Sequence, residues 1–115
     1  LFSKHRYLSS QMVPYCADGL WLDMAMAANA RMAQLVQGLA RVPGAHLCHP
    51  AAGNLAFIDA PRAAHARAFA AGAQYYLFDG TLDDGPSDAP LRCRIVCDWA
   101  KTPEDVKQLL AAWAD

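Results

Sequence analysis

The chain has 115 residues, of which 55% are hydrophobic and 18% are charged, and its formal net charge is −1. This length suits one compact domain and is too short for two, and the composition argues against a disordered chain. A net charge this close to zero excludes the basic footprint of proteins that bind nucleic acid or anionic membranes. No apolar run approaches the roughly 18 residues that a membrane-spanning helix needs.

The four cysteines are scattered among ordinary core-forming residues. A secreted scaffold held by disulfides would be denser in cysteine, so we expect reduced thiols and a cytoplasmic location. The first six residues, Leu1 to Arg6, contain neither an initiator methionine nor an apolar signal core, and we expect the chain to be part of a longer protein. The surplus of apolar over charged residues suggests that another domain or subunit covers part of its surface.

Residues 1–41 are expected to be helical. Leu8 and Met12 are four residues apart and indicate a first helix, which Pro14 should interrupt because proline removes a backbone donor. A second helix should start at Asp18, a candidate N-cap. Its apolar residues recur at spacings of three and four, which places them on one stripe: Trp21, Met24, Ala28, Met32, Leu35 and Leu39.

The rest of the chain alternates short strands with helices. Thr102 and Pro103 followed by two acids predict the start of the last helix, because a hydroxyl N-cap, a first-position proline and first-turn acids all favour it. The expected order after Gly44 is strands at 45–49 and 55–59, a helix at 61–71, strands at 74–78 and 91–99, and the helix that Thr102 begins. This order predicts an α+β fold. Its small antiparallel or mixed sheet of three or four strands is covered by helices, behind a long N-terminal helical segment.

Metal binding deserves consideration because His46, Cys48 and His49 cluster while Cys93 and Cys97 are four apart. On a strand, His46 and Cys48 would point to one face and His49 to the other, so the three could not chelate one ion. Structural zinc sites show tighter pairs of ligands. We therefore predict no metal site and thiols that pack in the core. Since no Gly-x-Ser-x-Gly elbow or phosphate-binding loop is present either, the chain carries no complete active site of its own.

Two groups of basic residues could bind an anion. Arg92 and Arg94 are two apart on an expected strand, so their side chains should share a face. Either they form a surface pair that meets Asp98 or the nearby acidic loop, or one guanidinium grips a carboxylate with its planar fork. The basic residues Lys4, His5 and Arg6 either form a solvated helix face or contact a phosphate in a larger assembly.

Six runs of residues carry a family resemblance, in one register along nearly the whole chain: Ser3–Ser10, Asp18–Leu22, Ala28–Ala30, Val42–Gly44, His49–Asn54 with Phe57, and Arg94–Trp99 ahead of the last helix. They resemble the low-specificity L-threonine aldolases of bacteria, in the β-eliminating lyase/threonine aldolase family of fold-type I enzymes that use pyridoxal 5′-phosphate (PLP). In that family a large domain carries PLP and its Schiff-base lysine, and a small C-terminal domain follows. The resemblance implies a helical linker at residues 1–41 and the small domain at residues 42–115.

The resemblance also implies an activity. PLP would act as the electron sink while L-threonine or a related β-hydroxy amino acid is cleaved to glycine and an aldehyde. Arg94 would bind the substrate carboxylate, and Lys4 would reach the cofactor phosphate of a neighbouring subunit in a homo-oligomer. Lys4 falls after the family's Schiff-base segment, so it is not expected to hold PLP covalently, and no catalytic residue is assigned to this chain. Two alternatives stay open: a free-standing α/β ligand-binding or regulatory domain, and the small domain of another fold-type I lyase.

Overall fold

The computed structural model describes residues 4–115, so Ser3, the first residue of the resembling runs, lies outside the described residues. The helices and strands follow one another in the order expected from the sequence. Their bounds are α1 (His5–Cys16), η1 (Ala17–Gly19), α2 (Leu20–Gly38), η2 (Leu39–Arg41), β1 (His46–Leu47), β2 (Leu55–Pro61), α3 (Arg62–Ala70), β3 (Tyr76–Phe78), β4 (Pro90–Val96) and α4 (Pro103–Ala114).

The strands form one antiparallel sheet in the order β1-β2-β4-β3, which confirms the predicted α+β fold. β2 and β4 pair along their whole length, from Leu55 opposite Val96 to Pro61 opposite Pro90. Asn54 closes one end of this ladder. Its side-chain amide donates to the Cys97 carbonyl at 2.8 Å, and its own carbonyl accepts from the Cys97 N–H at 2.9 Å.

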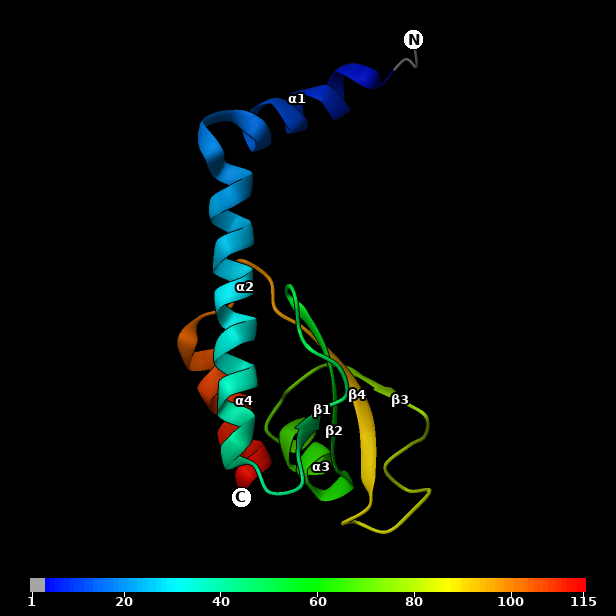
Figure 1. Ribbon diagram of the computed structural model, residues 1–115. Helices are drawn as coiled ribbons and strands as arrows, with labels where there is room; N and C mark the ends of the chain where they lie inside the picture. The colour runs from blue at the N-terminus through cyan, green and yellow to red at the C-terminus, as the bar shows by residue number, and fades with distance from the viewer. Residues whose placement is uncertain (1–3) are drawn as a thin grey trace.

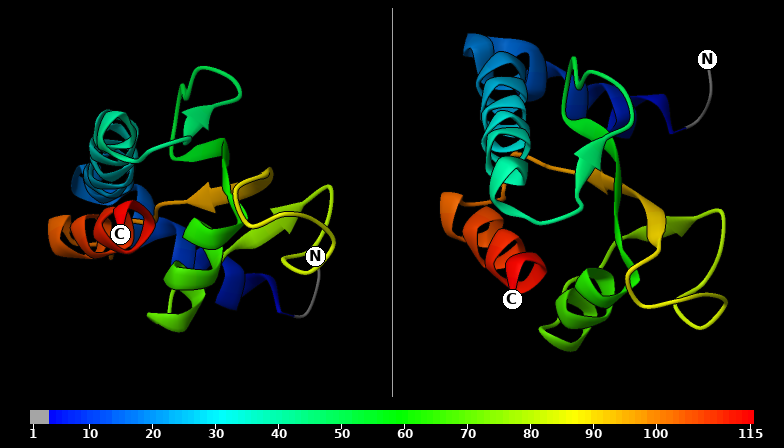
Figure 2. Two further views of the ribbon diagram at one scale, coloured as in Figure 1. Left: turned by 90° about the horizontal axis from the view of Figure 1, so that it is seen from below. Right: turned by 60° about the horizontal axis from the view of Figure 1, so that its bottom comes forward.

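The core lies on one face of the sheet, between the strands and the helices α2, α3 and α4 (Figures 1 and 2). Figure 2 shows α2 and α4 side by side, and a Cβ placed on Gly38 of α2 would overlap the Leu110 side chain of α4. Glycine at this position therefore permits the close approach of the two helices. Alternate strand residues and one stripe of each helix fill the core: Ala56, Ile58, Cys93, Ile95, Met32, Leu35, Leu39, Ala64, Ala68, Val106 and Trp113.

The N-terminal helices extend away from this core. The expected apolar stripe is buried only from Ala28 onward. Trp21, near the start of α2, is 47% exposed, whereas Met32 is 1% exposed. α1 has no buried residue and extends away from the start of α2 (Figure 1). The radius of gyration is therefore 17.4 Å, against about 13 Å for a compact chain of this length. Within residues 4–115, no helix is long and apolar enough to cross a membrane.

Two expectations about the first helices are wrong. α1 continues through Pro14 to Cys16, because a proline in the last turn of an exposed helix removes only one of that turn's donors. The chain turns at Asp18 and Gly19 instead, which both have left-handed φ values of 51° and 77°. Asp18 does not cap α2, because an N-cap needs extended backbone at the residue just before the helix, and that residue is Gly19.

The predicted start of the last helix is confirmed. The Thr102 hydroxyl accepts from the Asp105 N–H at 3.2 Å, and the Asp105 carboxylate accepts from the Thr102 N–H at 2.7 Å. Pro103 occupies the first helical position. This reciprocal cap fixes the direction in which α4 leaves β4, because it satisfies N–H groups that the first turn would otherwise leave unpaired.

Candidate functional site

The face of the sheet opposite the core carries no helix of the described chain. Antiparallel register places Asp59, Arg92 and Phe78 in one row across β2, β4 and β3, and Phe57, Arg94 and Tyr76 in the next. Residues directly opposite each other project to the same side of the sheet. We call these six residues the open face. Arg92 and Arg94 both belong to it.

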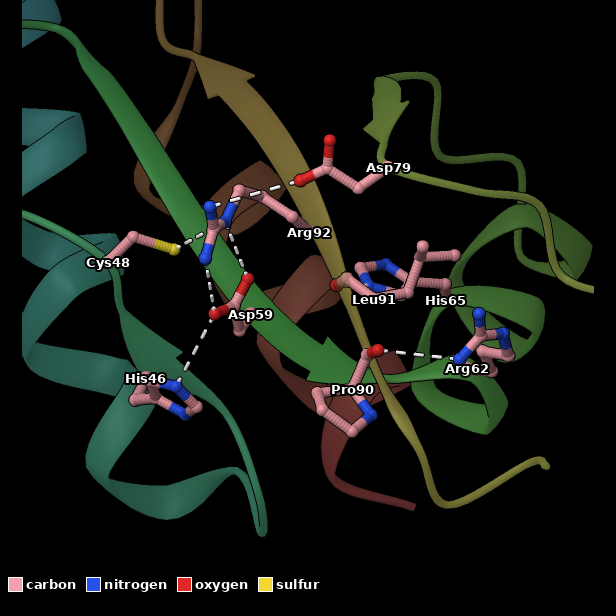
Figure 3. A network of polar contacts seen from close by, with 9 residues as sticks. All are labelled: His46, Cys48, Asp59, Arg62, His65, Asp79, Pro90, Leu91 and Arg92. Carbon is pink, nitrogen blue, oxygen red and sulfur yellow. Dashed lines mark hydrogen bonds and ion pairs between the residues drawn. The ribbon is translucent and has the colours of Figure 1, made fainter. Parts of the chain in front are cut away.

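Arg92 is paired with a carboxylate on the open face (Figure 3). Its Nε and Nη2 donate to the two carboxylate oxygens of Asp59, each at 2.9 Å, and Nε also lies 3.1 Å from the Cys48 sulfur. These hydrogen bonds lower the pKa of Asp59 and raise that of Arg92. A more distant acid, Asp79, lies 3.9 Å from Nη1.

The interpretation of the arginines as a pair that meets Asp98 or the acidic loop is only partly right about Arg92: Asp79, at the start of that loop, is a distant partner, and the main partner is Asp59 on β2. Asp98 is engaged elsewhere, since its Oδ1 accepts from the N–H groups of Ala100 and Lys101. The partner could not be found without knowing the register of β2 against β4.

Arg94 differs from Arg92 because no hydrogen bond or ion pair joins its side chain to any residue of the 4–115 range. Its Nε is buried and unpartnered, the one such side-chain nitrogen or oxygen among the described residues. The guanidinium carbon lies 4.9 Å from the ring centre of Tyr76 and 6.0 Å from that of Phe78. Both distances lie within the roughly 6 Å range of cation–π contacts, and no acid among residues 4–115 pairs with the guanidinium, a group that can bind a carboxylate with two parallel donors.

The other predicted site residue, Lys4, is not brought near the open face within this chain. It stands exposed immediately before α1, and α1 lies apart from the sheet (Figure 1). Its neighbour His5 makes a local contact of 3.2 Å between Nδ1 and the Ser9 hydroxyl.

The cysteines and histidines singled out for metal binding are divided between the core and the sheet edge. Cys93 and Cys97 are buried, as expected for core thiols, and burial raises the pKa of Cys93 to about 12. Cys48 instead borders Arg92, and His46 Nε2 lies 3.6 Å from an Asp59 oxygen. Among residues 4–115, no group of three His, Cys, Asp or Glu side chains is placed to hold a metal ion.

The structure also contains a buried polar network that sequence reasoning missed. His65 is fully buried, with Nε2 2.9 Å from the Leu91 carbonyl and Nδ1 2.9 Å from the Tyr75 hydroxyl. Because a carbonyl only accepts, Nε2 carries a proton, and in the neutral ring that burial favours Nδ1 accepts from the Tyr75 hydroxyl. The Trp113 indole N–H donates to the same hydroxyl at 3.0 Å. The network anchors β4 at Leu91, the residue before Arg92, and Figure 3 shows Leu91 beside His65.

We expect the network to make the protein sensitive to acid. Burial lowers the pKa of His65 below its ordinary value, so the unfolded chain binds more protons than the folded one as the pH falls through about 6.5. The free energy of unfolding should be highest above that pH and decline below it. Urea unfolding from pH 7.5 to pH 5 measures this slope. His65→Gln should flatten the slope, and His49→Gln, at an exposed position, should not. An unchanged slope in His65→Gln would show that another group causes it.

The fold and the open face together define a small α+β domain with helices on one face and an unpaired arginine on the other. A search of solved structures finds this fold in a threonine aldolase from Leishmania major, with a TM-score of 0.69 and 20% sequence identity. The match covers 86% of this chain and 27% of that one, so the chain spans about a quarter of the aldolase's length. No protein-family model and no curated protein matches the chain. The similarity establishes a threonine aldolase-like fold for this part, and it does not single out the bacterial subtype.

Proposed function

We propose that this chain is the small C-terminal domain of a PLP-dependent aldolase of the bacterial low-specificity type. The whole enzyme would cleave L-threonine or a related β-hydroxy amino acid to glycine and an aldehyde. The observation that carries the proposal is the free guanidinium of Arg94, held by Tyr76 and Phe78 on the open face. The likeness of the fold to part of a threonine aldolase supports it.

In this proposal Arg94 orients the substrate. Two parallel N–H donors of a guanidinium hold both oxygens of a carboxylate, which fixes the position of the amino acid and the rotation about its Cα. The ring centres of Tyr76 and Phe78 lie 4.9 and 6.0 Å from the guanidinium carbon, within the range of cation–π contacts. PLP, when bound, supplies the electron sink that lets the Cα–Cβ bond break.

We expect PLP to be attached to another part of the enzyme and not to this chain. PLP needs a lysine amine for its imine, and none of the three lysines of the chain belongs to the open face. Lys107 lies 3.5 Å from Glu104 on the surface of α4, and Lys101 is exposed before the cap of that helix. We therefore assign the Schiff-base lysine to a large domain outside this chain. Residues 1–41 then form the helical linker to that domain, and residues 42–115 the small domain.

The exposed apolar residues of the first two helices support this arrangement. Met12, Val13 and Met26 are each more than half exposed, at 55%, 70% and 54%. Surfaces of this kind are normally covered by another domain or subunit. We propose that the large domain and a second copy of the enzyme cover them, in a cytoplasmic homo-oligomer in which Lys4 reaches the cofactor phosphate of the neighbouring subunit.

The experiment compares the full-length protein with residues 1–115 alone. The full-length protein with PLP should release glycine from L-threonine and keep its cofactor on the polypeptide after borohydride reduction. Residues 1–115 should do neither, because the imine-forming lysine is assigned elsewhere. A keto acid and ammonia in place of glycine would indicate a different lyase. Borohydride-stable PLP on Lys4 of the short chain would contradict the assignment of the cofactor to the large domain.

A further inference from the structure

The acid on the open face lies within reach of both arginines. Asp59 is directly opposite Arg92, and Arg94 is two residues further along β4 on the same face. Diagonal neighbours of this kind have Cβ atoms within about 7–8 Å of each other, which a long side chain can span. Both oxygens of Asp59 are nevertheless occupied by Arg92, and the Arg94 guanidinium lies over the rings of β3.

Among residues 4–115, Asp59 has no comparable second partner. Its side chain is only 18% exposed, so water solvates it poorly. His46 is 3.6 Å away, but its side chain is 63% exposed, and pairs at such exposed positions contribute little. The Cys48 thiol is a weak hydrogen-bonding group, and burial raises its pKa, so it stays neutral. If Arg92 were absent, the remaining guanidinium on the open face would be that of Arg94.

A carboxylate of the protein that reached Arg94 would compete with the carboxylate of the substrate. Because it is tethered within reach, it would compete at a high effective concentration. We propose that Arg92 is a positioning residue that holds Asp59 away from Arg94 and so keeps Arg94 free for the substrate carboxylate. This inference rests on the proposed function, and it adds a role for the ion pair beyond joining β2 to β4.

The test is a double-mutant comparison in the full-length holoenzyme, with kcat and KM measured for L-threonine. Arg92→Ala should raise KM roughly tenfold or more, within the range known for coupled neighbours, and should change kcat less. The double variant Arg92→Ala/Asp59→Asn should bring KM back to within about threefold of the wild-type value, because the competing charge is gone. A purely structural role for the pair would raise KM for L-threoninamide, which has no carboxylate, as much as for L-threonine, whereas the inference predicts a rise for L-threonine alone.

A matched control removes a different acid. Asp79 also approaches Arg92, at 3.9 Å, but its side chain is 73% exposed, so water solvates its charge. Arg92→Ala/Asp79→Asn should therefore keep the raised KM of Arg92→Ala.

Arg92→Lys is a second single variant in case Arg92→Ala folds poorly. It keeps a cation beside Asp59, and its KM should lie closer to that of the wild type.

The outcomes separate this inference from the proposed function. An unchanged KM in Arg92→Ala overturns the inference, and so does an equally raised KM in Arg92→Ala and Arg92→Ala/Asp59→Asn. In both cases Arg94→Ala would still raise KM if the proposed function holds. If Arg94→Ala itself leaves KM for L-threonine unchanged, the proposed function is wrong and the inference falls with it.

Discussion

Replacement of Arg94 by alanine is expected to lower kcat/KM for L-threonine by roughly two to four decades in the enzyme that contains this chain. A substrate carboxylate that has left water would lose its partner, and breaking a buried charge pair costs about 3–5 kcal/mol. Arg94→Lys should do less harm but should both raise KM and lower kcat. Lysine offers one point charge in place of two parallel donors, so the substrate would bind more weakly and in a less defined orientation.

Steady-state kinetics on the purified variants measures this effect. Arg41→Ala is the matched control, because Arg41 is an exposed arginine in η2, outside the sheet. Its kcat/KM should stay close to that of the wild type. A kcat/KM of Arg94→Ala close to that of the wild type would mean that other residues bind the substrate carboxylate, even if the fold is that of a threonine aldolase.

The second large effect concerns stability. Trp113→Ala should lower the free energy of unfolding by about 3–5 kcal/mol, the range for removing a buried tryptophan. Trp113 is 1% exposed and stands edge-on to the rings of His65 and Tyr75, at centre distances of 5.8 and 6.0 Å. The substitution opens a cavity under α4 and also removes the N–H that donates to Tyr75. Since domains are stable by only about 5–15 kcal/mol, this loss should be readily measured.

Urea unfolding of the full-length protein, monitored through a spectroscopic signal of this domain, compares the free energy of unfolding of the variants with that of the wild type. Trp99→Ala is the control, because that indole is 59% exposed and belongs to no buried cluster. It should change the free energy of unfolding by less than about 0.5 kcal/mol. Trp113→Phe, which keeps most of the ring and loses only the N–H, should fall between the two. If Trp113→Ala and Trp99→Ala lowered the free energy of unfolding by the same amount, the α4 side of the core would contribute little to stability.

Local sequence signals predicted those parts of the fold that depend on nearby residues. The cap at Thr102 involves groups three residues apart, and the buried stripe from Ala28 to Leu39 follows from helical periodicity. The start of α2 was missed because Asp18 suits an N-cap by residue type, whereas its backbone is left-handed here. Residue type alone does not report the backbone conformation that a cap needs.

The site was predictable only in part, because its contacts join distant segments. That Arg92 and Arg94 share a face follows from strand geometry, but their different partners follow from the register of β2 and β3 against β4. The His65 network joins residues 10 to 38 apart in the chain. His65 shares a helical face with Ala64 and Ala68, which could have indicated burial, but nothing local identifies the groups that satisfy it.

The most direct test is whether Arg94 recognises a carboxylate. In the full-length enzyme, kcat/KM should be compared for L-threonine and L-threoninamide, which has the same Cα–Cβ bond and side chain but no carboxylate charge. We expect the wild type to prefer L-threonine by at least about a hundredfold, and Arg94→Ala to prefer it by less than about threefold. A preference that survives intact in Arg94→Ala would contradict the assignment of Arg94 to the substrate carboxylate.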